Sequence, residues 1–450
     1  MSVVAVVPEG LSPADRDALA PGAFVQLDWR SPRRNAIFDL SALEEAAGPL
    51  SPSVADLADL VGAVFLTDLA VPRGRNEQFV RSLELHLPLR DPGLWQGQAR
   101  TLGRLLYLLL GDNLGLHFYA REPEPPAGAA GKPCDADCVC LVSGGLDSLA
   151  GAVMLLRAER RPLFVTHRSG NPTIAEAQRR LSDVFTRLGG RFHGAGVTLM
   201  PSLTPRSLPF PPAELREPSR RSRSLLFMAL GAAAAAGLST PEVYLCENGV
   251  LTAALPLSPS RAGALSTRST HPAVLGLFTS LTGGLGLPGR ILNPFLYQTK
   301  AEVIRDVLRP VLRIEEIQQT VSCWMAGRRH RQCGGCVPCL LRRMAMLAAG
   351  LPDEAYEVDV LARPEDYRGT DAYVNLVDLL SYVGRLSAGS AVELVLDAPA
   401  LLDLQAFNVS VPDTVMMLKR FAAEVSAVVE GYFPASARML ATLAGPSPES

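Results

Sequence analysis

Cys138-Val-Cys-Leu-Val142 runs directly into Ser143-Gly-Gly-Leu-Asp-Ser148, and this stretch carries the strongest structural signal in the chain. The apolar run predicts a buried strand, and the helical spacing of apolar residues over 147–157 predicts a helix after it. The two glycines between them permit a tight turn that brings the backbone close to a ligand. The helix would direct free N–H groups and the positive end of its dipole at that ligand. The stretch therefore predicts a strand, an anion-binding loop and a helix.

The side chains of this loop favour a nucleotide phosphate over a simple turn. The hydroxyls of Ser143 and Ser148 would donate to phosphate oxygens, and Asp147 would bind a Mg²⁺ ion that bridges the phosphates. The loop is not a Walker A sequence, because no Gly-Lys-Ser/Thr follows. An ordinary turn in which Asp147 or Ser148 caps the helix is the alternative, but the flanking strand and helix favour phosphate binding. The predicted loop ligands are Ser143, Gly144, Gly145, Leu146, Asp147 and Ser148.

Strand-like and helix-like segments alternate beyond the loop. This alternation is typical of an α/β fold with a parallel sheet covered by helices on both faces. The expected strands are 162–166 and 242–246, and the expected helices are 173–188 and 225–236. The proline-rich segment 201–218 is predicted to be a mobile loop.

Composition shifts predict three regions along the chain. Residues 1–125 read as an accessory α/β domain, and 133–350 hold the phosphate-loop domain. A segment rich in Pro, Gly and Ala at 121–132 is the expected linker between them. Residues 351–450 read as a mainly helical extension. Outside the central domain, a strand is expected at 24–29 and helices at 51–65, 94–110, 372–386 and 414–432.

Overall composition excludes several classes of protein. The 450 residues are 48% hydrophobic, which is enough for packed cores and argues against wholesale disorder. The net charge of −2 gives no general attraction to nucleic acid or to an anionic membrane. Apolar runs fall short of the roughly 20 residues that a membrane span needs, and the N-terminus lacks the pattern of a signal peptide. We therefore expect a cytoplasmic protein whose thiols stay reduced.

Four of the eight cysteines cluster late in the sequence. Cys333, Cys336 and Cys339 form two overlapping CxxC steps, and Cys323 can supply a fourth thiolate. Four thiolates favour a closed, structural zinc site. Buried free cysteines are one alternative, and an iron–sulfur cluster or a persulfide-carrying cysteine is another, because spacing alone does not select the metal.

The hexapeptide Ser143–Ser148 matches the SGGxDS signature of the PP-loop ATP pyrophosphatases. The resemblance implies a HUP-type, Rossmann-like sheet, ATP with Mg²⁺ as cofactors, and formation of an adenylate with release of pyrophosphate. It also implies that Thr166 and His167, after the second strand, lie near the adenosine. A ligand at this edge of the sheet is expected independently, because such sheets bind ligands at the carboxyl ends of their strands.

Together with the late cysteines, the loop resembles 7-cyano-7-deazaguanine synthase, the QueC family of queuosine biosynthesis. The resemblance covers about 138–350 and implies that the cysteines bind Zn²⁺. Thr299-Lys300-Ala301-Glu302 matches a family lysine motif, so Lys300 would contact phosphate or adenylate. Arg223 matches the family's arginine at a helix start. A solvated lysine and a solvated basic turn are the alternatives for these two residues.

The region where the family binds its deazapurine acid departs from the family pattern. Here Glu247 and Asn248 would contact the guanine-like edge, and Arg268 would clamp a carboxylate. A turn and a surface loop are the alternative interpretations of the two segments. With its long flanking regions, the chain resembles QueC-like proteins of antiviral operons, the Qat and type IV CBASS systems. That resemblance implies transfer of the activated deazaguanine to an amine of a partner protein.

Three functional hypotheses remain open at the level of sequence. The favoured one is an ATP-dependent ligase or synthase that adenylates a 7-deazaguanine carboxylate or amide and forms an amide or nitrile. A tRNA-modifying PP-loop enzyme would need a basic surface and a redox-active cysteine. A non-catalytic nucleotide-binding component of a defence complex is the third. The oligomeric state and the roles of the flanking regions do not follow from the sequence.

Overall fold

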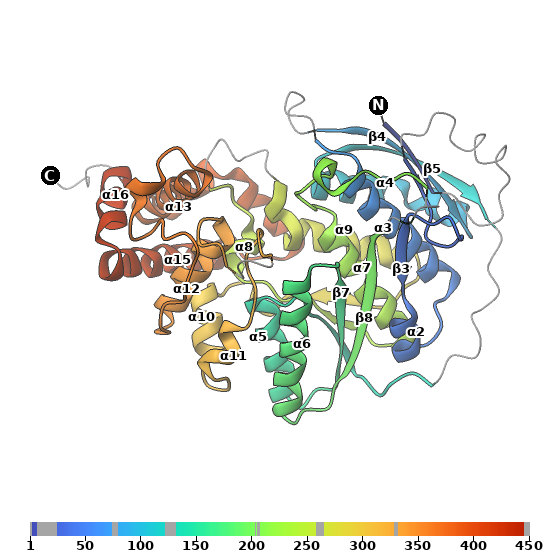
Figure 1. The fold of residues 1–450 in the computed structure, drawn as a ribbon, viewed down its shortest axis with the longest axis horizontal. Helices are drawn as coiled ribbons and strands as arrows, with labels where there is room; N and C mark the ends of the chain where they lie inside the picture. The colour runs from blue at the N-terminus through green and yellow to red at the C-terminus, as the bar shows by residue number, and fades with distance from the viewer. Residues whose placement is uncertain are drawn as a thin grey trace.

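The computed structural model describes residues 2–6, 25–73, 80–121, 132–202, 204, 208–257, 265–327 and 332–444. Two sheets lie in one half of the molecule and a group of helices in the other (Figure 1). The phosphate-loop strand belongs to the larger sheet. The predicted linker 121–132, apart from its two end residues, and the tail after 444 lie outside the described residues.

The larger sheet has six strands in the order β10-β9-β6-β7-β8-β3. Its strands are β3 (Ala36–Asp39), β6 (Cys138–Leu141), β7 (Pro162–Arg168), β8 (His193–Pro201), β9 (Glu242–Tyr244) and β10 (Arg290–Leu292). Every neighbouring pair is parallel except β3 and β8, which are antiparallel. The mostly parallel α/β sheet predicted from the alternating pattern is confirmed.

Alternate side chains of the central strand β6 pack into two different hydrophobic cores. Val139 and Leu141 join a buried cluster with α3 (Pro52–Ala70) and α7 (Arg223–Leu238). Cys138 and Cys140 join a cluster on the opposite face with α5 (Leu146–Arg157) and α6 (Pro172–Arg187). This period of two is what a strand buried on both faces requires. Helices therefore cover both faces, as expected.

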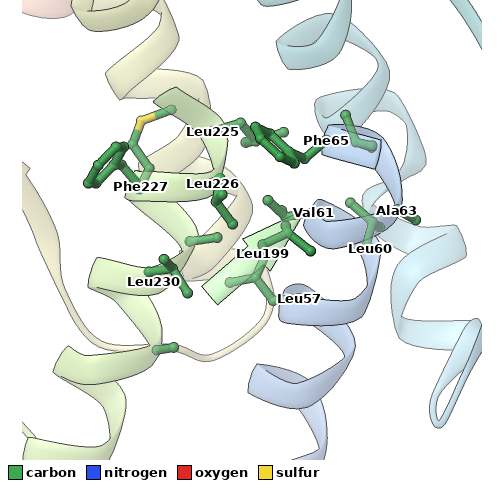
Figure 2. Close-up of a cluster of buried hydrophobic side chains, with 14 of the residues drawn as sticks. Leu57, Leu60, Val61, Ala63, Phe65, Leu199, Leu225, Leu226, Phe227 and Leu230 are labelled. Carbon is green, nitrogen blue, oxygen red and sulfur yellow. The ribbon is translucent and has the colours of Figure 1, made fainter. Parts of the chain in front are cut away.

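Close packing of α7 explains its run of small residues. A Cβ at Gly231 would lie 2.6 Å from Val243 Cγ1 of β9, so only glycine allows this approach. Figure 2 shows Leu225, Leu226 and Leu230 of α7 facing α3 across Leu199 of β8.

The second sheet is built from the N-terminal region, in the order β2-β1-β4-β5, with parallel pairing throughout. Its strands are β1 (Ser2–Val6), β2 (Val25–Leu27), β4 (Ser82–Leu89) and β5 (Asn113–Ala120), and α4 (Pro92–Leu110) joins the last two. One hydrophobic cluster spans this sheet, α3, α7 and the adjoining face of the larger sheet. The N-terminal region therefore packs directly on the phosphate-loop domain.

The C-terminal region is helical, as predicted, and lies on the opposite side of the molecule from β4 and β5 (Figure 1). Its apolar faces form a second cluster with α12 of the preceding domain. The helices concerned are α12 (Val337–Ala348), α13 (Asp371–Ala388), α14 (Ala391–Asp397), η6 (Pro399–Phe407), α15 (Val411–Tyr432) and α16 (Pro434–Ala444).

Shorter elements complete the described chain. They are α2 (Ser41–Ala47), η1 (Ala213–Leu215), α8 (Gly249–Ala253), η3 (Leu265–Thr270), α9 (Pro272–Gly284), α10 (Lys300–Val303), η4 (Ile304–Leu308), α11 (Ile314–Gln318) and η5 (Pro364–Tyr367). In the predicted loop 201–218 the described part holds one short helical turn, η1, with Leu208 and Phe210 buried against the core. Among the described helices, none combines the length and apolar character that crossing a membrane demands.

Candidate functional site

The glycine loop leaves β6 and leads into α5 as predicted. Gly144 has φ +95°, a conformation that other residues adopt only with strain, and its carbonyl accepts a 2.9 Å hydrogen bond from the N–H of Val321. Gly145 is the N-cap of α5, where no side chain accepts from the first turn. The helix therefore keeps N–H donors and the positive end of its dipole for an anion.

The two loop serines bond to each other across the turn. Ser143 Oγ lies 3.2 Å from Ser148 Oγ, which donates to the carbonyl of Gly145 at 3.0 Å. The loop is thus held in its shape by its own hydroxyls. A phosphate would receive donors from these side chains only if they exchange this internal bond.

Asp147, in the first turn of α5, interacts with polar groups from two other segments. Its Oδ2 accepts hydrogen bonds from Lys300 Nζ and, at 3.2 Å, from Asn248 Nδ2. Desolvation alone would raise the pKa of this carboxyl, but the Lys300 charge and hydrogen bonds with Glu247, Lys300 and Asn248 together outweigh it and lower the pKa below its usual value. Oδ1 is buried and has no hydrogen-bond partner among the described residues. An anionic oxygen without a partner is a suitable ligand for a divalent cation.

Glu247 lies against Asp147 and completes a pair of carboxyl groups. Burial and then the neighbouring Asp147 charge raise the pKa of Glu247 well above its usual value. Two carboxyls in one site cannot both be ionised at low cost, so Glu247 holds the proton and Asp147 the charge. Asn248 follows directly, with Nδ2 3.4 Å from Glu247 Oε1 and Oδ1 capping α8.

Asn293, at the end of β10, is a positioning residue that we did not predict. It accepts from the N–H of Glu247 at 3.1 Å and donates to the carbonyl of Glu247 at 2.8 Å. It also donates to Thr252 Oγ1 at 3.0 Å. These two hydrogen bonds to the backbone of Glu247 fix the position of that residue. The available signal was an Asn-Pro pair at the end of a strand, where side chains meet at the sheet edge.

Lys300 is the first residue of α10, and its backbone is held by a capping box. Thr299 Oγ1 accepts from the N–H of Glu302 at 3.1 Å, and Glu302 accepts from the N–H of Thr299 at 2.8 Å. This arrangement satisfies two otherwise free donors and fixes the start of the helix. Asp147, Glu247, Asn248 and Lys300, which we predicted separately, are therefore brought into one cluster.

His167 is at the carboxyl end of β7, but its side chain is fully buried. Its Nε2 lies 2.9 Å from the carbonyl oxygen of Leu199, and its ring packs edge-on against Phe65 and Phe227. Burial lowers the pKa of His167 to about 4, so the ring is neutral at pH 7. Thr166 beside it is half-buried. An adenosine here would meet Thr166 or the backbone rather than the imidazole.

Arg223 begins α7 near this histidine. Its guanidinium lies 5.6 Å from the centre of the Phe227 ring, and its buried Nε has no hydrogen-bond partner. Desolvation, followed by the nearby Arg220 charge, lowers the pKa of Arg223 to about 10. Among the described residues, no carboxylate forms an ion pair with it. A desolvated cation of this kind would bind an anionic ligand favourably.

Arg268, in η3, lies apart from the Asp147 cluster in its interactions. Burial lowers the pKa of Arg268, while Tyr107 of α4 and Asp403 of η6 act in the opposite direction. The charges that act on this arginine thus belong to the N-terminal and C-terminal regions. Its predicted contact with a substrate carboxylate stays a prediction.

The four late cysteines converge as their spacing predicts. All their sulfur atoms lie within 4.8 Å of one another, with Cys333 to Cys339 and Cys336 to Cys323 each at 3.9 Å. A tetrahedral zinc site with Zn–S bonds of about 2.3 Å needs sulfurs about 3.8 Å apart, so the geometry fits Zn²⁺. Gly334, with φ +86°, makes the turn between ligands, where a Cβ would lie 2.1 Å from the carbonyl oxygen of Val358.

Comparison with known proteins identifies relatives of this chain. The family model of the queuosine biosynthesis protein QueC matches residues 283–350, which include Lys300 and the cysteines. A 7-cyano-7-deazaguanine synthase of Thiobacillus denitrificans is 30% identical over 235 residues, which are 49% of this chain and 97% of that protein. The synthase of Nitrosococcus oceani is 28% identical over 240 residues, 48% of this chain and 95% of the relative.

These alignments cover nearly the whole of each relative, whereas about half of this chain lies outside them. The glycine loop, the Asp147–Lys300 pair and the four-cysteine cluster supply the physical features of a PP-loop domain with a metal knuckle. The chain belongs to the QueC family, whose curated members are named 7-cyano-7-deazaguanine synthase.

Proposed function

We propose that the chain uses ATP and Mg²⁺ to adenylate the carboxylate of a 7-deazaguanine acid, and that an amine then displaces AMP. The observation that carries the proposal is the cluster of Asp147 and Lys300 at the uncapped start of α5, directly after the glycine loop. A helix N-terminus and a lysine supply positive charge for phosphate oxygens, and the carboxylate supplies a ligand for a cation.

The first step needs alignment and charge stabilisation more than acid–base chemistry. A substrate carboxylate oxygen attacks the α-phosphorus of ATP, the bond from phosphorus to the bridging oxygen breaks, and pyrophosphate leaves. Amides of Gly144 and Gly145 and of the first turn of α5 would hold the phosphates. Lys300 would stabilise charge that develops at the α-phosphate. Asp147 Oδ1 would hold Mg²⁺, whose charge would help to neutralise the departing pyrophosphate.

The second step forms the carbon–nitrogen bond. The amine nitrogen attacks the carbonyl carbon of the acyl adenylate, AMP leaves with the bonding electrons, and the nitrogen releases a proton. With ammonia the product is an amide, and a second adenylation, of the amide oxygen, would give the nitrile after loss of AMP. Protonated Glu247 could donate to, and accept from, the polar edge of a guanine-like base, and Asn248 and Arg268 remain candidate substrate contacts.

The acceptor is a separate part of the proposal. We propose that the regions outside the QueC-like core bind a partner protein and place one of its amines at the acyl adenylate. Such a transfer is what the resemblance to antiviral-defence members of the family implies. Support comes from the resemblance of this long chain to QueC-like proteins of antiviral operons. It also comes from the packing of α15 against the start of α10, which carries Lys300. Intact-mass measurement of co-purified partner proteins after incubation with deazaguanine acid and ATP would show an added deazaguanine.

Pyrophosphate release with a 7-deazaguanine carboxylate tests the function itself. The wild-type chain should release pyrophosphate only when both ATP and the acid are present, and ammonia should yield an amide or nitrile. Uncharged tRNA in place of the acid is the comparison for a tRNA-modifying enzyme. Pyrophosphate release with tRNA alone, or no release with any acid despite ATP binding, would reject the proposal in favour of the corresponding alternative.

A further inference from the structure

Helix α15 of the C-terminal region reaches the helix that carries Lys300. Thr299 Oγ1 donates to Glu424 Oε1 of α15 at 3.0 Å, and Arg420 of α15 forms an ion pair with Glu302. Arg420 also donates to the carbonyl of Tyr297 at 2.8 Å. Both members of the capping box that starts α10 therefore bond to the same helix from outside the core.

Glu424 faces the lysine side of α10. Together with Lys300 and Asn248 it lines a small cavity, mainly apolar, with walls from α12 and α15. The cavity has room for about one water molecule, so a nucleotide does not fit in it. Desolvation raises the pKa of Glu424, while its bond to Thr299 acts in the opposite direction. Burying a carboxyl group in an apolar wall costs free energy, and the hydrogen bond from Thr299 offsets part of that cost.

We propose that α15 is a working part of the active site, in which Glu424 and Arg420 position Lys300 for adenylation. The inference rests on the proposed function, because it assumes that Lys300 contacts the reacting phosphate. Glu424 sets the orientation of Thr299, Arg420 sets that of Glu302, and the capping box transmits both to the first residue of α10. The match to the QueC family model ends at residue 350, so α15 lies outside the residues matched to that family.

The test compares substitutions on α15 by steady-state pyrophosphate release. Glu424→Ala should lower kcat about tenfold with little change in KM for ATP, because the Thr299 hydroxyl loses the charged acceptor of its proton. Glu424→Gln should recover most of kcat, since its amide oxygen can still accept from Thr299. Arg420→Ala, at a more exposed ion pair, should lower kcat about threefold. Glu430→Ala, exposed on the same helix, is the matched control and should keep the wild-type rate.

A double-mutant cycle separates positioning of Lys300 from a general effect on stability. In a Lys300→Ala background, Glu424→Ala should cause little further loss, because the group that it positions is gone. Equal losses in both backgrounds, or a wild-type rate for Glu424→Ala, would overturn the inference. A wild-type rate for Lys300→Ala would instead count against the proposed function.

Hydrogen exchange provides a readout that does not depend on activity. The amides of Ala301–Val303 should exchange faster in Glu424→Ala and Arg420→Ala than in Glu430→Ala, because the start of α10 loses its outside support. Unchanged exchange at these amides would overturn the inference even if activity falls. If Glu424→Ala does not fold, exchange at Ala301–Val303 and kcat are compared between Arg420→Ala and Glu424→Gln. Wild-type values of both quantities in Arg420→Ala would then overturn the inference.

Discussion

Asp147 is the residue on which the site depends, because one carboxyl group joins the glycine loop to Lys300, Asn248 and Glu247. Oδ2 serves the protein and buried Oδ1 is left without a partner among the described residues. This division explains how a single side chain could both orient Lys300 and bind a cation. The residue type was predictable from the loop signature, but its bonds depend on segments about 100 and 150 positions away.

We predict that Asp147→Asn abolishes activity without unfolding the protein. The amide keeps the shape of the side chain but loses the charge that binds Mg²⁺ and pairs with Lys300, so pyrophosphate release should fall by at least about 100-fold. The melting temperature should stay within a few degrees, since the desolvation cost of the buried Asp147 charge is also removed. A variant that retains a tenth of the wild-type rate would contradict this role, and Asp183→Asn on α6 is the control.

His167 makes stability depend on acidity. Its folded pKa is about 4, below the ordinary value of 6.5, so the unfolded chain binds a proton that the folded chain does not. Stability from this residue is therefore complete above pH 6.5 and is lost as the pH falls toward 4. The loss amounts to about 3 kcal/mol at 1.36 kcal/mol per pKa unit. Denaturant unfolding of wild type and His167→Gln at several pH values between 4 and 7 checks this. The free energy of unfolding should fall more steeply with falling pH in wild type than in the variant, and the same pH dependence in both would exclude this role.

At the scale of elements, long periodic segments were predictable, and of the short strands β2 and β9 were expected but β3 and β10 were not. The strand at 138–142 and the helices α3, α4, α5 and α7 appear where their patterns placed them. β3 and β10 have four and three residues, too few for any periodicity to show. In β5, Leu114, Leu116 and Phe118 alternate with Gly115, His117 and Tyr119, and this signal was missed. Asn293 was missed because its function exists only through the tertiary contact with Glu247.

The four-cysteine cluster is an element whose stability should depend on a bound metal ion. The region joins Cys323 to α12, and thiolates brought within 4.8 Å repel one another without a cation. Cys339→Ser, or removal of zinc by a chelator, should unfold residues 320–345 and make them sensitive to protease. Cys134→Ser, outside the cluster, should retain one zinc per chain and resist protease. Full protection of the metal-free protein would show that packing alone holds the segment.

At the scale of the whole molecule, the regions added to the QueC-like core are fastened to it by buried polar contacts as well as apolar ones. Asp68 of α3 accepts hydrogen bonds from Arg81 at 2.7 Å and from Ser222 Oγ, next to α7, at 2.9 Å. The carboxyl and the guanidinium are both almost fully buried. The N-terminal region therefore cannot separate from α7 without exposing a paired charge.

Asp68→Ala should destabilise the entire chain rather than the N-terminal sheet alone. Removing one partner leaves Arg81 as a buried charge with less compensation, at a cost of about 3–5 kcal/mol. Unfolding by denaturant should remain a single transition with a lower midpoint, because one hydrophobic cluster spans both sheets. An early separate transition confined to the N-terminal region would contradict this coupling.

The most direct measurement is a crystal structure of the protein with Mg²⁺ and a non-hydrolysable ATP analogue. The account predicts triphosphate oxygens against the amides of residues 144–148, the metal ion on Asp147 Oδ1, and Lys300 within hydrogen-bond distance of the α-phosphate. A nucleotide bound elsewhere, or a loop whose amides are already paired and closed to phosphate at saturating analogue, would contradict it.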